Sequence, residues 1–134
     1  MSNPVIPESL QPLLTSKAVA FVSTLGPHGE PQTTPIWFLW QDGAVHISLV
    51  DGRQKLKNLR RDPRISVVIV DPAEPTRDLE LRGRIDALTP DPDRILERAV
   101  ALKYVGKDVD VEPAGTMRYT TRIQVERITK QDGI

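Results

Sequence analysis

The densest group of side chains able to do chemistry lies in "DGRQKLKNLRRDPR", residues 51–64. The whole chain balances 18 Lys and Arg against 18 Asp and Glu, yet residues 53–64 hold six of the 18 cations and a single acid, Asp62. Those six cations are Arg53, Lys55, Lys57, Arg60, Arg61 and Arg64. Such a run is compatible with a solvated helix face. A phosphate site explains the bias in sign better, because mixed charges are enough for solubility.

The position of this segment points to where an anion would bind. A strand-like pattern ends at Val50, Asp51 and Gly52 form a turn, and Arg53 opens a helix. The first amides of a helix have no partner within it and carry the positive end of its dipole, so they attract anions. The Arg53 guanidinium and the Lys55 ammonium add charged donors at the same place. If the segment binds an anion such as phosphate, the site is therefore expected beside Arg53 and Lys55, and a solvated helix face is the alternative that the residues alone leave open.

The rest of the sequence contains few candidate residues for catalysis or metal binding. His28 lies in a Gly/Pro turn and His46 in a strand, without a spacing that links either to carboxylates, and the chain has no cysteine. The sequence contains no G-x-S-x-G elbow, no H-E-x-x-H pair, no EF-hand and no P-loop. We expect no metal site and identify no catalytic residue. If the protein is an enzyme, a cofactor must supply its chemistry.

Size and charge set further limits. A chain of 134 residues fits one domain, covering 1–134. Zero net charge argues against binding nucleic acid, and no apolar run approaches the roughly 20 residues that span a bilayer. The opening "MSNPVIPESL" has neither the basic nor the apolar region of a secretory signal. These features predict a cytoplasmic protein with no nucleic-acid or membrane partner.

Periodicity and turn signals predict a mainly β protein with inserted helices, an α+β arrangement. Strands are expected at 18–25, 31–40, 44–50, 64–70, 79–88 and 116–128, and helices within 7–17, after Gly52 up to Pro63, and within 89–106. In the last helix we expect a buried stripe of Ile95, Leu96, Ala99 and Leu102. Short turns between strands favour antiparallel pairing, and a sheet of six strands avoids costly edges by closing on itself. A small antiparallel barrel is the predicted fold.

Three stretches carry a family resemblance: "GEPQTTPIWF", "GRQKLKNLRRDPR" and "LELRGRI". The sequence resembles the pyridoxamine phosphate oxidase-like superfamily from about residue 10 to 128. It is most similar to the short enzymes that use the deazaflavin coenzyme F420, in which R-x-K-x-x-N-L is typical. The resemblance implies a six-stranded antiparallel split β-barrel of the FMN-binding type with two or three helices. It also implies a homodimer with cofactor sites between the protomers.

The resemblance further implies a set of cofactor-binding residues. Arg53 and Lys55 would hold the cofactor phosphate, with Gln54 and Asn58 nearby. The ring of the cofactor would be lined by strand residues Gln32, Thr33, Thr34, Pro35 and Ile36. The ribityl chain would lie above a second strand segment, Ser48, Leu49 and Val50.

The implied function is an F420-dependent reductase that transfers hydride to a small, activated or conjugated acceptor. An FMN-binding oxidoreductase on the same barrel, or a protein that binds a flavin or deazaflavin without catalysis, are the alternatives. The resemblance does not include the longer C-terminal part with which pyridoxamine phosphate oxidases bind substrate, so that reaction is not expected.

Overall fold

The computed structural model describes residues 4–108, 113 and 115–133. The helical segments are η1 (Glu8–Leu10), α1 (Gln11–Thr15), α2 (Gln54–Arg61) and α3 (Ile95–Val105). The strands are β1 (Ala20–Leu25), β2 (Pro31–Ile36), β3 (Leu39–Gln41), β4 (Ala44–Val50), β5 (Arg64–Val70), β6 (Arg77–Ile85), β7 (Thr89–Pro90) and β8 (Arg118–Asp132).

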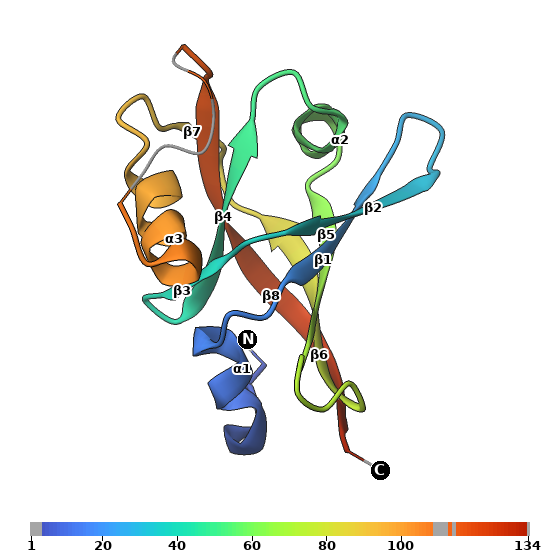
Figure 1. The fold of residues 1–134 in the computed structure, drawn as a ribbon. Coiled ribbons are helices and arrows are strands. Elements are labelled where there is room, and N and C mark those ends of the chain that lie inside the picture. Colours follow the sequence, from blue (N-terminus) through green and yellow to red (C-terminus); the bar gives the residue numbers. More distant parts are fainter. Residues whose placement is uncertain (1–3, 109–112, 114, 134) are drawn as a thin grey trace.

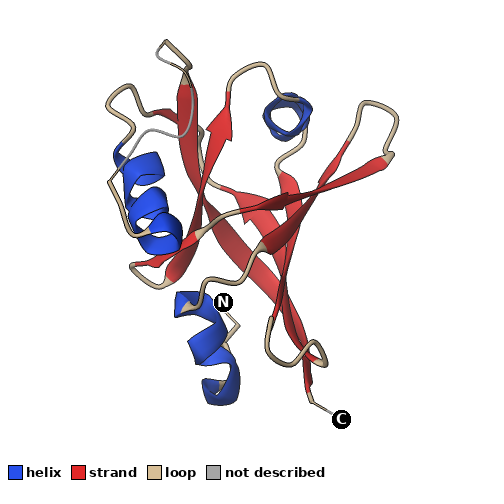
Figure 2. Ribbon diagram, viewed as in Figure 1, coloured by secondary structure: helices blue, strands red, loops and turns tan. Residues whose placement is uncertain are grey.

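All strand pairs are antiparallel and form one curled sheet in the order β2-β1-β5-β6-β8-β4-β3, with β7 also paired to β8. Figure 1 shows this sheet as an open half-barrel, and the helices lie around its margin (Figure 2). Helix α2 lies between the end of β4 and the start of β5 and packs against β1 and β4, while α3 packs on β3 and β4. The predicted split β-barrel is confirmed.

The number of strands in the prediction was wrong. The described part of the chain contains eight strands rather than six, because the segment 31–40 is not continuous. Its first half, β2, pairs with β1, and its second half, β3, pairs with β4. Trp37 and Phe38 lie at the point where the chain crosses from one neighbour to the other. The short β7 accounts for the remaining strand.

The interior of the half-barrel is filled by aliphatic side chains. The N-terminal leucines that predicted a helix, Leu10, Leu13 and Leu14, are all buried, and Phe38 belongs to the same core with 0% exposure. The expected stripe of α3 was correct for Leu96 and wrong for Ile95 and Leu102, while Ala99 is half-buried. Leu96, Glu97, Val100 and Ala101 face inward, whereas Ile95 is 71% and Leu102 56% exposed. The helix ends at Gly106 as predicted, with a φ of 81° that favours glycine.

A bulge in the long pair β6–β8 depends on Gly83. The register shifts between Arg82 and Gly83, and the backbone of β8 crosses very close to the glycine. A Cβ at this position would overlap the carbonyl oxygen of Gln124 and lie 2.9 Å from its carbonyl carbon. Only glycine fits here because the backbones approach so closely.

The two ends of the sheet have different protection. Strand β2, at one end, contains Pro31 and Pro35, neither of which has an amide hydrogen to offer. Strand β3, at the other end, has only three residues. No helix in the described residues is long and apolar enough to cross a membrane.

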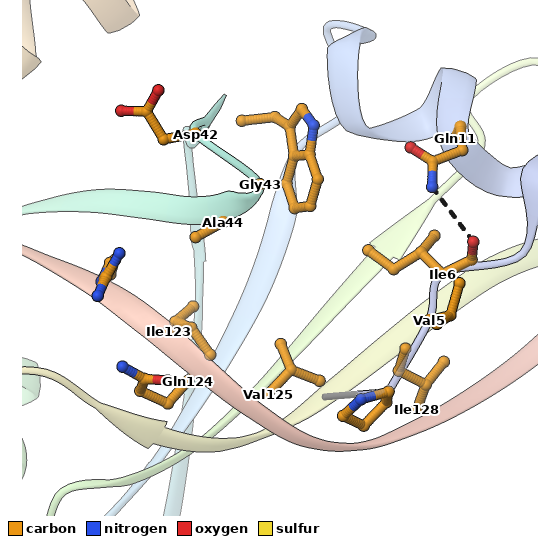
Figure 3. A pocket seen from close by; sticks show the side chains of 13 residues that line it. Val5, Ile6, Gln11, Asp42, Gly43, Ala44, Ile123, Gln124, Val125 and Ile128 are labelled. Carbon is orange, nitrogen blue, oxygen red and sulfur yellow. Dashed lines mark hydrogen bonds between the residues drawn. The ribbon is translucent and has the colours of Figure 1, made fainter. Parts of the chain in front are cut away.

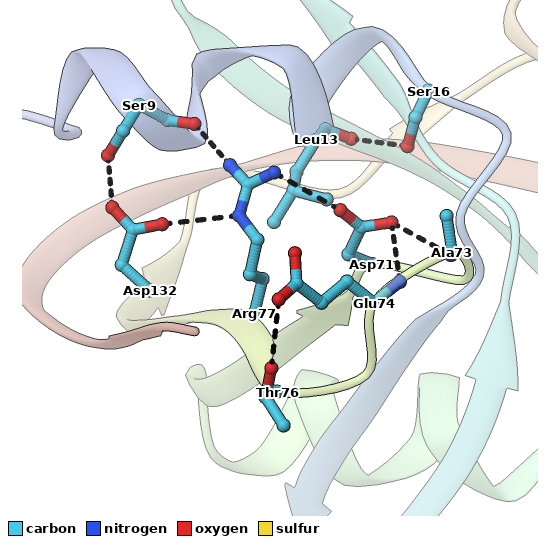
Figure 4. A network of polar contacts seen from close by, with 9 residues as sticks. All are labelled: Ser9, Leu13, Ser16, Asp71, Ala73, Glu74, Thr76, Arg77 and Asp132. Carbon is cyan, nitrogen blue, oxygen red and sulfur yellow. Dashed lines mark hydrogen bonds and ion pairs between the residues drawn. The ribbon is translucent and has the colours of Figure 1, made fainter. Parts of the chain in front are cut away.

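Arg77 joins three distant parts of the chain (Figure 4). Its guanidinium donates to Asp71 (3.3 Å), to Asp132 (3.2 Å) near the end of β8, and to the carbonyl oxygen of Ser9 in η1. The Ser9 hydroxyl also donates to Asp132. The network fastens the N-terminal helical segment to the last strand.

We expect Arg77→Met to lower the free energy of unfolding by about 1–2 kcal/mol, because charged hydrogen bonds at a half-buried site are lost. Hydrogen bonds from Ser9 and then Arg77 lower the pKa of Asp132. The Asp132 carboxylate therefore contributes to the free energy of unfolding above its unfolded pKa of 3.8, and this contribution is lost as the pH falls through its lower pKa in the folded state. Urea unfolding of wild type and Arg77→Met at neutral and acidic pH checks both points. Arg127→Met, at an exposed arginine of β8, is the matched control.

Candidate functional site

The start of α2 has an arrangement that favours an anion. Arg53 is the N-cap residue, and a guanidinium cannot accept hydrogen bonds from the first-turn amides. The first turn contains no acidic residue either. Ordinary helices place Ser, Thr, Asp or Asn at the cap and acids in the first turn, so this helix start is suited to an external anion.

A pocket of about 150 Å³ opens at this helix start and collects half of the predicted site residues. Its walls are formed by Ile36, Ser48, Leu49, Val50, Arg53 and Lys55, together with Leu56 and Arg118. Burial and the nearby Arg53 charge lower the pKa of Lys55. Arg53, at the N-cap of α2, and Lys55, in its first turn, thus line the same small space. Arg118, from β8, was not predicted.

Asn58 is placed to organise the site rather than to reach into it. Its side chain is 1% exposed and its amide donates to Thr24 (3.0 Å) and Gln32 (3.2 Å). Its carbonyl oxygen accepts from Gln54 (2.7 Å) and Arg61 (3.3 Å). Asn58 therefore ties α2 to β1 and β2, and three predicted residues, Gln32, Gln54 and Asn58, form one hydrogen-bonded group.

The five predicted residues of β2 divide between the two faces of the strand. Gln32, Thr34 and Ile36 are less exposed and share the face with Asn58 and the pocket, while Thr33 and Pro35 lie on the opposite, exposed face. The Thr33 hydroxyl is 2.8 Å from that of Ser23. The Thr34 hydroxyl is buried and has no hydrogen-bond partner among the described residues. A buried hydroxyl without a partner calls for a group from outside the chain, such as a water molecule or a ligand. The contact of each residue with a cofactor stays a prediction.

A cluster of aromatic side chains packs against the end of β2. Trp37 stacks on Tyr104 of α3, with ring centroids 4.8 Å apart and an angle of 3° between planes. The Tyr104 hydroxyl donates to the carbonyl oxygen of Ala18 (2.7 Å). Lys103 donates to the carbonyl oxygen of Phe38 (2.9 Å) and lies 3.8 Å from the centroid of its ring. The cluster fixes the crossover between β2 and β3, and Trp37 lies beside Ile36.

Burial lowers the pKa of Lys103 to about 8. In the unfolded chain its pKa returns to 10.5, so between these values the unfolded state binds more protons than the folded state. We therefore expect the free energy of unfolding to rise as the pH increases from about 8 towards 10.5, and this rise to disappear in Lys103→Met. Urea unfolding across this range measures it. Lys57→Met, at an exposed lysine of α2, is expected to keep the wild-type slope.

A larger pocket, of about 450 Å³, lies elsewhere and contains none of the predicted residues. Figure 3 shows its apolar floor of Ile123, Val125 and Ile128, with a hydrogen bond from Gln11 to the Ile6 carbonyl oxygen at one side. Outside this pocket, the Nε2 atom of His46 is hydrogen-bonded to the carbonyl oxygen of Gln41 (3.1 Å). Within the described residues, no group of three His, Asp or Glu side chains is placed to hold a metal ion.

The curled antiparallel sheet defines a split β-barrel, with a basic pocket at the start of α2. The family model for pyridoxamine 5'-phosphate oxidase matches residues 6–132, nearly the whole chain. The chain belongs to the pyridoxamine 5'-phosphate oxidase family.

Solved structures of the same fold bear different names. The chain is similar to an F420 reductase, with 26% identity and a TM-score of 0.84 over 92% of this chain and 98% of that one. It is also similar to a heme-binding protein from Mycobacterium smegmatis (22% identity, TM-score 0.70, 97% of this chain and 56% of that one). An FAD-binding protein from Mesorhizobium loti is a third (20% identity, TM-score 0.67, 94% of each chain). The last two likenesses concern the fold alone. No curated protein matches the chain.

Proposed function

We propose that this protein is a cytoplasmic reductase that binds reduced F420 and delivers hydride to a small, activated or conjugated acceptor. The observation that carries the proposal is the convergence of Arg53, Lys55 and the α2 start on one pocket beside β2 and β4. The similarity to an F420 reductase over nearly the full length of both chains supports the choice of cofactor.

The residues present fit such a cofactor. Arg53, Lys55 and the first amides of α2 would hold the phosphate, and Ser48 and Val50 would border the chain that leads from it. The partly buried face of β2, with Gln32, Thr34 and Ile36, would lie along the ring. When bound, the deazaflavin supplies hydride chemistry and reacts poorly with oxygen. The protein binds and orients it and excludes water.

We also propose that the protein is a homodimer joined through the outer face of β1, β2 and β5. Phe21 on this face is 42% exposed and Val19 36% exposed, and Phe21 is opposite Pro35 on one side and Val68 on the other. Exposed aromatic and aliphatic side chains in a row are typical of a buried interface. Sedimentation at micromolar concentration tests this, and a monomer there would contradict the dimer.

Cofactor binding and turnover test the function directly. Fluorescence titration with F420 and with FMN gives the preference, because the same anion pocket can also accept the phosphate of FMN. Catalysis is tested by offering reduced F420 together with a panel of quinones and enones as acceptors. The absorbance of F420 measures its oxidation. We expect micromolar or tighter binding of F420 and turnover with at least one acceptor. Tighter binding of FMN would instead indicate the FMN oxidoreductase. Binding without turnover across the panel would indicate a protein that only binds the cofactor.

A further inference from the structure

A buried ionic group lies behind the anion pocket. The Glu97 carboxylate, on the inward face of α3, has 2% of its side chain exposed. It faces the Nε atom of Arg118 at 3.1 Å and that of Arg94 at 3.7 Å, whose side chains are 9% and 11% exposed. A carboxylate and two guanidinium groups therefore share the space between α3 and β8.

Arg118 connects this group to the pocket. It is the first residue of β8, opposite Val50 of β4, and its Nη1 atom donates to the Ser48 hydroxyl at 3.1 Å. Arg118 and Ser48 both line the pocket that contains Arg53 and Lys55. The pocket thus has cations from two sides, since Arg53 and Lys55 come from α2 and Arg118 comes from the sheet.

Stability alone is a poor explanation of this arrangement. Removing charged groups from water costs more than a buried ion pair usually returns, and apolar side chains of similar volume often stabilise as well or better. A buried carboxylate that fixes a guanidinium at the wall of a ligand pocket has a role in ligand binding that explains it better. It holds the donor in one orientation before the ligand arrives, which lowers the cost of ordering on binding.

We propose that Arg118 contacts the bound anion as its third cationic donor, and that Glu97 is a positioning residue that holds Arg118 against Ser48. The inference deepens the proposed function and rests on it in one respect, namely that the anion is the phosphate of the cofactor. Glu97 also offsets part of the positive charge of the pocket, so three cations can lie close together without an anion.

The test compares ligands that differ only in the phosphate. FMN and riboflavin are titrated by flavin fluorescence into wild type and Arg118→Met. The methionine keeps the length of the stem, and Glu97 keeps Arg94 as a partner, so the variant is expected to fold. Arg118→Met should weaken FMN binding about tenfold or more and leave riboflavin binding unchanged, because only FMN carries the phosphate. Lys57→Met, outside the pocket, should weaken FMN binding only slightly and leave riboflavin binding unchanged. A folded Arg118→Met with the wild-type preference for FMN over riboflavin would overturn the proposal.

Glu97 is tested by its charge. Glu97→Gln should reduce the preference for FMN over riboflavin, and Glu97→Asp, which keeps the carboxylate, should retain more of it. A residue with only a structural role would lower the melting temperature without moving this ratio, and that result would remove Glu97 from the proposal.

Inorganic phosphate separates this inference from the proposed function. If wild type binds no flavin and no F420 but phosphate raises its melting temperature, and Arg118→Met loses that rise, the anion contact stands and the cofactor assignment fails. If phosphate gives no rise and FMN binds no better than riboflavin, Arg118 contacts no anion.

Discussion

Gly83→Ala is expected to lower the free energy of unfolding by about 3–5 kcal/mol, at the upper end of what single substitutions do. The new methyl group would overlap the backbone of Gln124, which belongs to the longest strand and cannot move without breaking its ladder. Because β6 and β8 are central in the sheet order, a displaced bulge affects both halves of the half-barrel. Urea unfolding followed by circular dichroism measures the loss.

Gly43→Ala is the matched control. Gly43 has a φ of 73° in the turn between β3 and β4, and a Cβ there would meet open space. Its replacement should cost only about 1 kcal/mol, from the left-handed backbone. Equal losses for the two variants would mean that the close approach at Gly83 is relieved by a small shift of β8.

Removing the charge of Arg53 or Lys55 should weaken cofactor binding by about 1.5–3 kcal/mol for each residue, the scale of a charged hydrogen bond. The melting temperature without cofactor should barely change in Arg53→Ala and should not fall in Lys55→Ala. Burial and the Arg53 charge already disfavour the protonated ammonium of Lys55, so its removal relieves repulsion. Fluorescence titration with F420 and FMN measures the affinities.

Arg60→Ala and Lys57→Ala are the controls on the same helix. Arg60 is 3.7 Å from Asp51 and lies 4.7 Å from the centroid of the Tyr119 ring, outside the pocket. Both controls should change affinity only weakly and through a term that salt screens. If Arg60→Ala loses as much affinity as Arg53→Ala, the phosphate does not lie at the start of α2.

Local signals were enough to predict most elements of the sheet. The strands at 44–50 and 64–70 have the predicted bounds, since each is rich in β-branched or other apolar residues and is followed directly by a turn signal, Asp51-Gly52 and Asp71-Pro72, respectively. The break at Trp37 and Phe38 could not be predicted in this way. Both halves of the segment are strand-like, and only the choice of neighbour, made by the three-dimensional fold, separates them.

The prediction of the inward face of α3 failed for a related reason. Apolar residues occur all around this helix, so its periodicity does not select one face. The inward face includes Glu97, whose carboxylate contacts Arg118, 21 positions later in the chain. No local pattern indicates that pair, and for the same reason Arg118 escaped the predicted site. The basic segment, by contrast, could be interpreted locally because a turn, a helix start and two cations follow one another directly.

The prolines of β2 also bear on how copies of this protein can associate. A bare strand edge invites another chain to add to it, and repeated addition produces open-ended fibrils. Pro31 and Pro35 interrupt the row of amide donors at one edge, and the three residues of β3 leave little of the other to extend. Association is then left to the faces of the sheet, where a two-fold contact uses the same surface on both partners and is complete once made. These edges favour a particle of fixed size over a polymer.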